Sequence, residues 1–354
     1  MNSLLGVLVR FRQEDVALMC DVEQVHSFYV NPDHRNFLRF LWFKDNNPSG
    51  EIVEYRMLVH LFGNASSPAV ATFGMRKTAE DGGEEFGSAA KEFVYNDFYV
   101  DDGLISRPTD QETIELLKNT QAMLATAWLR LHKAISNSVP VMKALPAEDR
   151  GESVRDFDFR HDTLPTQHSL GVHWDLEGEA FTFHVTLPER PFTRRGVLSI
   201  INSVYDPLGL AAPVILKGKL LLRQLVIMGK QGSDTPLGWD DPLPEKLMCQ
   251  WQSWRNALVD LENVSVSRCY HSKDFGRVVR SEIHSFSDAR KDGTGVATYL
   301  RQINESGDVS VAFLFGQARM APLNPTTIPR LELCGAVLSS QSVKKLLRVD
   351  HTST

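Results

Sequence analysis

The segment Phe98-Tyr-Val-Asp-Asp-Gly-Leu-Ile-Ser106 (FYVDDGLIS) places two adjacent acids between two apolar runs. Two unit charges about 4 Å apart repel by roughly 4 kcal/mol at an effective dielectric of about 20, so a buried hairpin needs a counter-charge. Hard divalent cations such as Mg²⁺ supply one, because they take carboxylate oxygens as ligands. The segment is therefore interpreted as a strand-turn-strand hairpin that directs Asp101 and Asp102 into a metal site. The alternative is a plain hairpin turn at Asp101-Asp102-Gly103, since Asp-Gly is a strong turn signal.

A third carboxylate is available on another predicted strand. Residues 16–22 (VALMCDV) are a short apolar run with one acid, Asp21, close to its end, and they are interpreted as a buried strand. Residues 54–63 and 91–100 are the other strands expected in the same three-strand layer. Asp21 would complete a set of three acids able to hold two metals about 3.5–4 Å apart for phosphoryl transfer.

The remaining pattern predicts helices in the middle of the chain and strands near its end. Pro68 starts one helix, and Thr109-Asp-Gln-Glu112 is a capping box for a helix with apolar residues as far as Leu131. Residues 169–188 read as a hairpin turned at Glu177-Gly178, and residues 193–261 carry helical spacing. Three strands between residues 281 and 315 precede a helix that begins near Pro329.

Composition limits the class of protein and its surroundings. With 354 residues, 42% hydrophobic and 23% charged, the chain is long enough for two or three domains. The net charge of −6 gives no overall support for nucleic-acid binding, so basic groups for such a partner must be gathered locally. No uncharged stretch reaches the length of a membrane span, and the start lacks a signal-peptide layout. An intracellular, cytoplasmic location without membrane association is expected, with nuclear access as part of a retroelement particle left open.

The cysteines suggest neither a disulfide scaffold nor a metal finger. The four of them are scattered and form no CxxC pair: Cys20, Cys249, Cys269 and Cys334. This spacing argues against a zinc site and fits a reducing compartment.

Several motifs resemble those of reverse transcriptases. Tyr99-Val100-Asp101-Asp102 resembles the YxDD signature, and the other matching segments follow in the order of a polymerase palm. They are LMCDVEQ (18–24) for the first carboxylate motif, LFGNASSPAVAT (61–72) for template and nucleotide packing, LRLHKAISNS (129–138) for the lysine motif, and SLGVHW (169–174) for the primer grip. Further segments resemble the polymerase region of BEL/Pao-type long-terminal-repeat retrotransposon polyproteins, and the resemblance covers nearly the whole chain. They are RNFLRFLWF (35–43), TRRGVLSIINSVYDPLGLAAPV (193–214) and TIPRLELCGA (327–336).

The resemblance implies a fold and a function. The fold would be α/β (α+β): a reverse-transcriptase palm over residues 1–188, a helical thumb or connection region over 189–278, and the first part of a ribonuclease H-like mixed sheet over 279–354. The activity would be RNA-directed DNA polymerisation by two-metal nucleotidyl transfer with Mg²⁺ or Mn²⁺. Partners would be an RNA or DNA template-primer and deoxynucleoside triphosphates, with peptidase and integrase segments elsewhere in the polyprotein.

Site residues carry over from the same motifs. The implied metal ligands are Asp21, Asp101 and Asp102 in the polymerase site, and Asp288 (HSFSDAR) with Glu332 in the ribonuclease H site. The implied substrate-binding residues are Tyr99, Gly63, Ser66, Ser67, Pro68 and Lys133. Three alternatives stay open: a plain turn before a helix for 63–68, a solvated helix-end lysine for Lys133, and a dipole-favoured acid in a first helical turn for Glu332.

Three departures from the family pattern bear on activity. The segment after Asp21 looks one residue short, which puts His26 where the family has its aromatic gate and displaces Phe28. Few residues precede Asp21, so the fingers are expected to be missing, and the chain ends soon after Glu332. A fragment with weak or no activity is therefore expected. The alternatives are an inactive remnant that at most binds nucleic acid, and a metal-dependent nuclease that uses only the C-terminal half.

Overall fold

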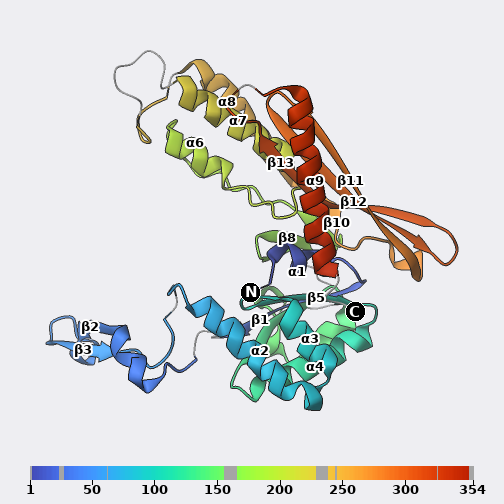
Figure 1. The fold of residues 1–354 in the computed structure, drawn as a ribbon. Coiled ribbons are helices and arrows are strands. Elements are labelled where there is room, and N and C mark those ends of the chain that lie inside the picture. Colours follow the sequence, from blue (N-terminus) through green and yellow to red (C-terminus); the bar gives the residue numbers. More distant parts are fainter. Residues whose placement is uncertain are drawn as a thin grey trace. The chain divides into compact units, whose positions relative to one another are not determined.

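A computed structural model describes residues 2–23, 28–61, 63–154, 166–228, 238–243, 245–324 and 326–350. The chain divides into two compact units (Figure 1). Unit 1 comprises Met1–Ser3 and Val16–Asp158, and unit 2 comprises Leu4–Asp15 and Phe159–Thr354. Both units combine helices with antiparallel sheets, so the predicted α+β class is confirmed. The boundaries after residues 188 and 278 stay predictions. Within the described ranges, no helix is long and apolar enough to cross a bilayer.

Unit 1 is built on a four-stranded antiparallel sheet covered by helices. The strands run in the order β4-β5-β1-β6, with bounds β1 Val16–Glu23, β4 Phe98–Tyr99, β5 Asp102–Arg107 and β6 Arg130–Ser136. The helices are α2 Ser67–Phe86, α3 Ser88–Asn96, α4 Asp110–Ala125 and α5 Val139–Lys143. Leu18, Cys20 and Val22 point from β1 into a core formed with α2, α3 and α4. Because successive side chains on a strand alternate between faces, Asp21 lies on the face away from this core.

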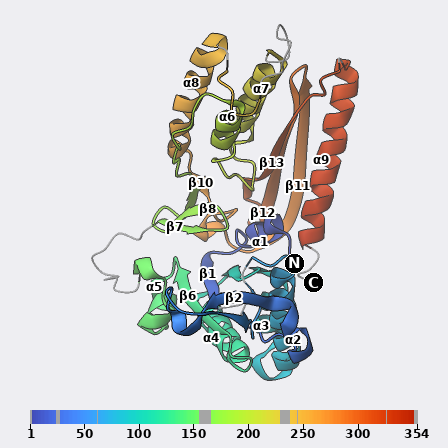
Figure 2. The same ribbon diagram turned by 90° about the vertical axis from the view of Figure 1, so that its left-hand side faces the viewer.

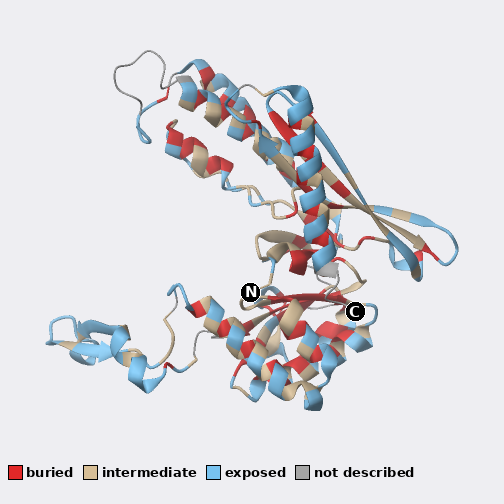
Figure 3. Cartoon of the chain, in the orientation of Figure 1, coloured by how far each residue is buried: buried red, intermediate tan, exposed pale blue. Residues whose placement is uncertain are grey.

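Two predicted strands of unit 1 are confirmed only over a few residues each. Residues 91–100 form most of helix α3 and only then the short strand β4, because Ala90, Phe93 and Val94 are buried at helical spacing. Residues 54–63 do not join the sheet. Strand β3 (Ile52–Arg56) pairs instead with β2 (Arg39–Phe43) in a separate hairpin whose residues are mostly exposed (Figure 3).

The N-cap half of the predicted capping box is confirmed at the start of α4, and Thr109 Oγ1 also donates to Glu112 Oε1 at 3.1 Å. Thr109 Oγ1 accepts a hydrogen bond of 3.2 Å from the backbone N–H of Glu112. The helix is shorter than predicted, because it ends at Ala125 and Leu131 already belongs to strand β6.

Unit 2 begins with helix α1 (Leu4–Arg10) and contains a small antiparallel sheet and a helical cluster. The sheet has the order β10-β9-β8-β7, with bounds β7 Thr166–Ser169, β8 Val172–Asp175, β9 Ala180–Thr182 and β10 Val266–Ser267. The β8–β9 pair confirms the hairpin predicted to turn at Glu177-Gly178. The helices α6 Arg194–Ile201, α7 Ala212–Met228 and α8 Met248–Ala257 share one hydrophobic core, as their spacing predicted.

The last part of unit 2 is a three-stranded antiparallel sheet with one long helix on it, which confirms the predicted order of elements. Its bounds are β11 Val278–Arg290, β12 Gly293–Asn304, β13 Val309–Met320 and α9 Ile328–Asp350. Helix α9 packs along β11 and β12, and α7 packs against β13 (Figure 2). The turn before α7 also reaches this sheet, because Gly316 N donates to Leu208 O at 2.8 Å.

Candidate functional site

The Tyr-Val-Asp-Asp segment forms a tight hairpin between β4 and β5. Tyr99 pairs with Asp102, so Val100 and Asp101 are the two turn residues. Val100 has φ = 63°, a strained value for a β-branched residue that a type II′ turn requires at its first position. The hairpin turn therefore lies earlier than Asp101-Asp102-Gly103, because Gly103 lies within β5, and the plain-turn alternative stays open.

The same hairpin places an acid directly opposite Asp21. In the β1–β5 pair, Asp21 is the cross-strand partner of Asp102, and Cys20 is the partner of Gly103. Side chains that lie directly opposite in an antiparallel pair share a face, with Cβ atoms about 4.5–5.5 Å apart. Val22 N also donates to Asp101 O at 3.0 Å. The structure thus brings the predicted carboxylate positions of β1 and of the hairpin to one place.

A lysine on the neighbouring strand neutralises Asp21. Lys133 Nζ lies 2.7 Å from Asp21 Oδ2, and this hydrogen bond raises the pKa of Lys133. Lys133 has φ = 49° and lies in a β-bulge of β6, where the pairing with β1 shifts register. Bulges redirect side chains in this way. Lys133 is therefore a strand residue, and the helix-end alternative is wrong.

A histidine that no sequence motif singles out borders the same carboxylate. His132 Nε2 lies 3.7 Å from Asp21 Oδ2. Burial lowers the pKa of His132 in spite of the nearby carboxylate, which favours the neutral imidazole. The spacing of His132 along the chain carries no signal for this role, because only strand pairing brings it to Asp21.

The acids create a negative environment that suits a hard cation. The pKa of the Cys20 thiol is raised well above its ordinary value, first by burial and then by the charges of Asp102 and Asp21. Carboxylate oxygens are the ligands that Mg²⁺ prefers, so the donor type fits. The three carboxylates are not yet close enough to share an ion, because the ligand atoms of Asp21, Asp101 and Asp102 do not all lie within 4.8 Å of one another.

The predicted substrate-binding residues around position 65 form the start of helix α2. Gly63 has φ = 84°, and Ser66 and Pro68 occupy the N-cap and the first turn. Ser67 is buried, and its Oγ donates to Leu61 O at 2.7 Å. These contacts account for the residues as a turn before a helix, which is the open alternative.

The two predicted ribonuclease H acids do not share one face of the β11–β13 sheet. A Cβ added at Gly335 of α9 would lie 3.5 Å from Cβ of Ser287, so Ser287 faces the helix. Asp288 is the next residue along β11 and therefore points to the other face of the sheet. Glu332 lies on α9 beyond its first turn, which also removes the helix-dipole alternative.

The face that carries Asp288 borders a large cavity. Its volume is about 770 Å³, and it lies between α7 and the β11–β13 sheet of unit 2. Apolar side chains such as Leu216, Phe286 and Tyr299 supply much of its lining, together with Asp288.

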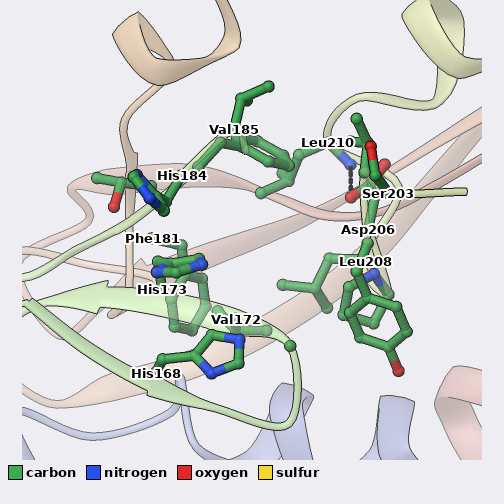
Figure 4. A pocket seen from close by; sticks show the side chains of 16 residues that line it. His168, Val172, His173, Phe181, His184, Val185, Ser203, Asp206, Leu208 and Leu210 are labelled. Atoms are coloured by element: carbon green, nitrogen blue, oxygen red, sulfur yellow. Dashed lines mark hydrogen bonds between the residues drawn. The ribbon is translucent and has the colours of Figure 1, made fainter. Parts of the chain in front are cut away.

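A second cavity in unit 2 gathers three histidines that the sequence analysis passed over (Figure 4). The rings of His168 and His173 lie 4.5 Å apart between centroids, and those of His173 and His184 lie 5.8 Å apart. Burial, and then the neighbouring His168 and His184, lower the pKa of His173. The spacing of His168 and His173 around Leu170-Gly171 could have indicated a cross-strand pair, which is what β7–β8 shows. His26, by contrast, lies outside the described residues, so the shortened segment after Asp21 stays a prediction.

Comparisons with known proteins point to retroelements for part of the chain. No curated protein matches it. A solved structure of the foamy viral protease-reverse transcriptase in complex with double-stranded DNA is similar in fold, with a TM-score of 0.57 at 13% identity. The match covers 98% of this chain and 50% of that one, so the chain spans half the length of the viral protein in that structure. Residues 193–353 match the model of the Pao retrotransposon-like RNaseH-like domain.

Proposed function

We propose that this chain is the RNA-directed DNA polymerase region of a BEL/Pao-type retrotransposon Pol polyprotein, joined to a partial ribonuclease H-like domain. The observation that carries the proposal is the cross-strand pairing of Asp21 with Asp102 beside the Tyr-Val-Asp-Asp turn. The retrotransposon-like match over residues 193–353 and the fold likeness to a viral reverse transcriptase support it. Peptidase and integrase segments of the same polyprotein, and a cytoplasmic setting, belong to the proposal.

The chemistry would be nucleotidyl transfer on a primed template. Asp21, Asp101 and Asp102 would hold Mg²⁺ or Mn²⁺, which lowers the pKa of the primer 3′-hydroxyl and neutralises the triphosphate. Lys133 supplies a positive charge at the same carboxylate. Because its side chain is half-exposed, the ammonium can turn from Asp21 to an incoming phosphate.

A second function, nucleic-acid binding without turnover, has its own support. Lys133 already neutralises Asp21, and the ligand atoms of the three acids do not all lie within 4.8 Å of one another. Displacements of about 1 Å in an active site can lower rates roughly a hundredfold. We therefore expect binding to a template-primer with little extension.

Primer extension and hybrid binding test the two functions together. The full chain is incubated with a DNA primer on an RNA template, deoxynucleoside triphosphates and Mg²⁺, and binding is measured over a salt series. Asp101→Asn is compared with Asp81→Asn, a matched control in which an exposed acid on α2 loses its partner Lys77. Extension that Asp101→Asn abolishes and Asp81→Asn retains supports the polymerase.

The other outcomes separate the alternatives. Salt-sensitive binding without extension supports the binding-only remnant, since phosphate contacts give salt-dependent affinity. A chain that neither binds the template-primer nor extends the primer refutes the proposal. Cleavage of the RNA strand that is lost in Asp288→Asn would support the nuclease instead.

A further inference from the structure

Three side chains with metal-binding atoms meet in unit 2, and none of them is a site residue assigned to the polymerase. Asp15, Cys269 and His271 each place one such atom within 4.8 Å of the other two. Within the described part of the chain, this is the single group of three that meets this distance. Cys269 Sγ lies 3.8 Å from Asp15 Oδ1.

These distances are close to those of an occupied site. Zinc bonds of about 2.3 Å to sulfur and 2.0–2.2 Å to nitrogen or oxygen place tetrahedral ligands roughly 3.3–3.6 Å apart. Side-chain movements on the order of 1 Å would therefore bring all three atoms onto one ion.

The backbone that carries the donors is firmly held. Arg12 Nε donates to Arg268 O at 2.8 Å, and Tyr270 N donates to Arg12 O at 3.1 Å. Arg268 is fully buried, and its Nη2 donates to Asp15 O at 2.8 Å. The segment that ends at Asp15 is thus fixed against the segment that carries Cys269 and His271.

The imidazole of His271 is also oriented. Its Nδ1 lies 3.1 Å from Ser272 O, and its ring stacks on Phe275 with centroids 5.5 Å apart. A backbone carbonyl on one ring nitrogen is the usual way to fix the tautomer of a metal-bound histidine. With Nδ1–H donated to Ser272 O, Nε2 keeps the lone pair that a metal needs.

We propose that Asp15, Cys269 and His271 form a zinc-binding site in unit 2. A thiolate, a carboxylate and a neutral imidazole carry a combined charge of −2, which one Zn²⁺ neutralises. The set suits zinc rather than Mg²⁺, which prefers oxygen ligands alone. All three residues are partly exposed, so water can occupy the fourth position.

The site would fasten the first segment of unit 2. The first segment of unit 2 ends at Asp15, where the chain continues into unit 1. An ion shared with Cys269 and His271 would therefore attach the end of this segment to the rest of unit 2. Zinc that binds the folded chain more tightly than the unfolded chain raises the temperature of unfolding.

Cobalt(II) titration of the full chain tests the proposal, because a cobalt–thiolate bond gives a charge-transfer absorption that histidine and carboxylate ligands lack. The wild-type chain should bind one Co²⁺ with this absorption, Zn²⁺ should displace it, and Mg²⁺ should not. Cys269→Ser should abolish the absorption. Cys249→Ser is the matched control, since Cys249 is an exposed free cysteine outside the group and its loss should change nothing.

Asp15→Asn and His271→Ala provide variants that keep the thiol. Each should weaken zinc binding by at least about a hundredfold, because losing even an outer contact to a ligand costs 10–100-fold. Circular dichroism establishes that each variant is folded. The proposal is overturned if the folded wild-type chain gives no thiolate absorption with Co²⁺, or if that absorption survives in Cys269→Ser.

Discussion

Replacing Gly209 by alanine should destabilise unit 2 far more than the same change at Gly276. The two glycines have almost the same positive φ, 78° at Gly209 and 77° at Gly276, and ψ of −167° puts Gly276 in a region that is essentially restricted to glycine. They differ in their surroundings. A Cβ on Gly209 would lie 1.8 Å from Gly316 O on β13, whereas a Cβ on Gly276 would have nothing within 4 Å.

The expected magnitudes follow from these distances. A backbone at such positive φ costs an alanine about 1–3 kcal/mol, and the stiffer unfolded chain returns about 0.4–1 kcal/mol, so Gly276→Ala should cost roughly 1–2 kcal/mol. At Gly209 the clash is with backbone, which cannot rotate away. Overpacking adds about 1–3 kcal/mol, and loss of the hydrogen bond from Gly316 N to Leu208 O adds about 1 kcal/mol. With a similar backbone cost, the total for Gly209→Ala is then roughly 3–6 kcal/mol.

Thermal and urea unfolding of the two variants measure the difference. For a unit of this size, about 1 kcal/mol shifts Tm by roughly 2–4 °C, so Gly209→Ala should unfold on the order of 5–15 °C below Gly276→Ala. Equal losses of stability in the two variants would refute the reasoning, because they would mean that the turn before α7 is not seated on β13.

Three other outcomes follow from single contacts. Thr109→Ala removes the cap of α4 and should lower the free energy of unfolding by about 1 kcal/mol in urea titrations; an unchanged midpoint would contradict the cap. Arg268→Met leaves the partly buried Glu179 carboxylate without its ion pair of 2.8 Å and should cost about 3–5 kcal/mol, so a loss below about 1 kcal/mol would count against it. Burial raises the pKa of Cys20, which lowers its thiolate fraction at any given pH. Alkylation near pH 8, followed by mass spectrometry, should therefore modify exposed Cys249 well before Cys20, and equal rates would contradict the assignment.

The sequence correctly predicted the helices and strands whose apolar residues follow a single clear pattern. The apolar run of β1, the Thr109 cap of α4 and the alternating strands before α9 all appear as expected. Each of these combines a strong start or stop signal with a single burial pattern, so tertiary contacts reinforce the local preference.

The two strands that were confirmed only in part had ambiguous patterns. In residues 91–100 aromatic and β-branched residues suggested a strand, but packing on α2 and α4 buries Ala90, Phe93 and Val94 as a helical stripe. In residues 54–63 the apolar residues are not all buried, because β3 pairs only with β2 in an exposed hairpin.

The sequence by itself determined the hairpin acids, the strand that carries Asp21 and the order of elements in the last sheet. These depend on neighbours a few positions apart along the chain. Tertiary structure alone decided which side chains share a face. Strand pairing set Asp21 opposite Asp102, and a bulge turned Lys133 toward Asp21. Strand alternation put Asp288 on the face away from α9.

The Asp15–Cys269–His271 group is also a feature that only the tertiary structure decided. The spacing of the cysteines argued against a zinc site, because residues far apart in sequence give no local signal. Only the pairing of the first segment of unit 2 with residues 267–271 brings an aspartate to the thiol and the imidazole. Local preference fixes what each segment can become, and long-range packing fixes which chemical groups meet.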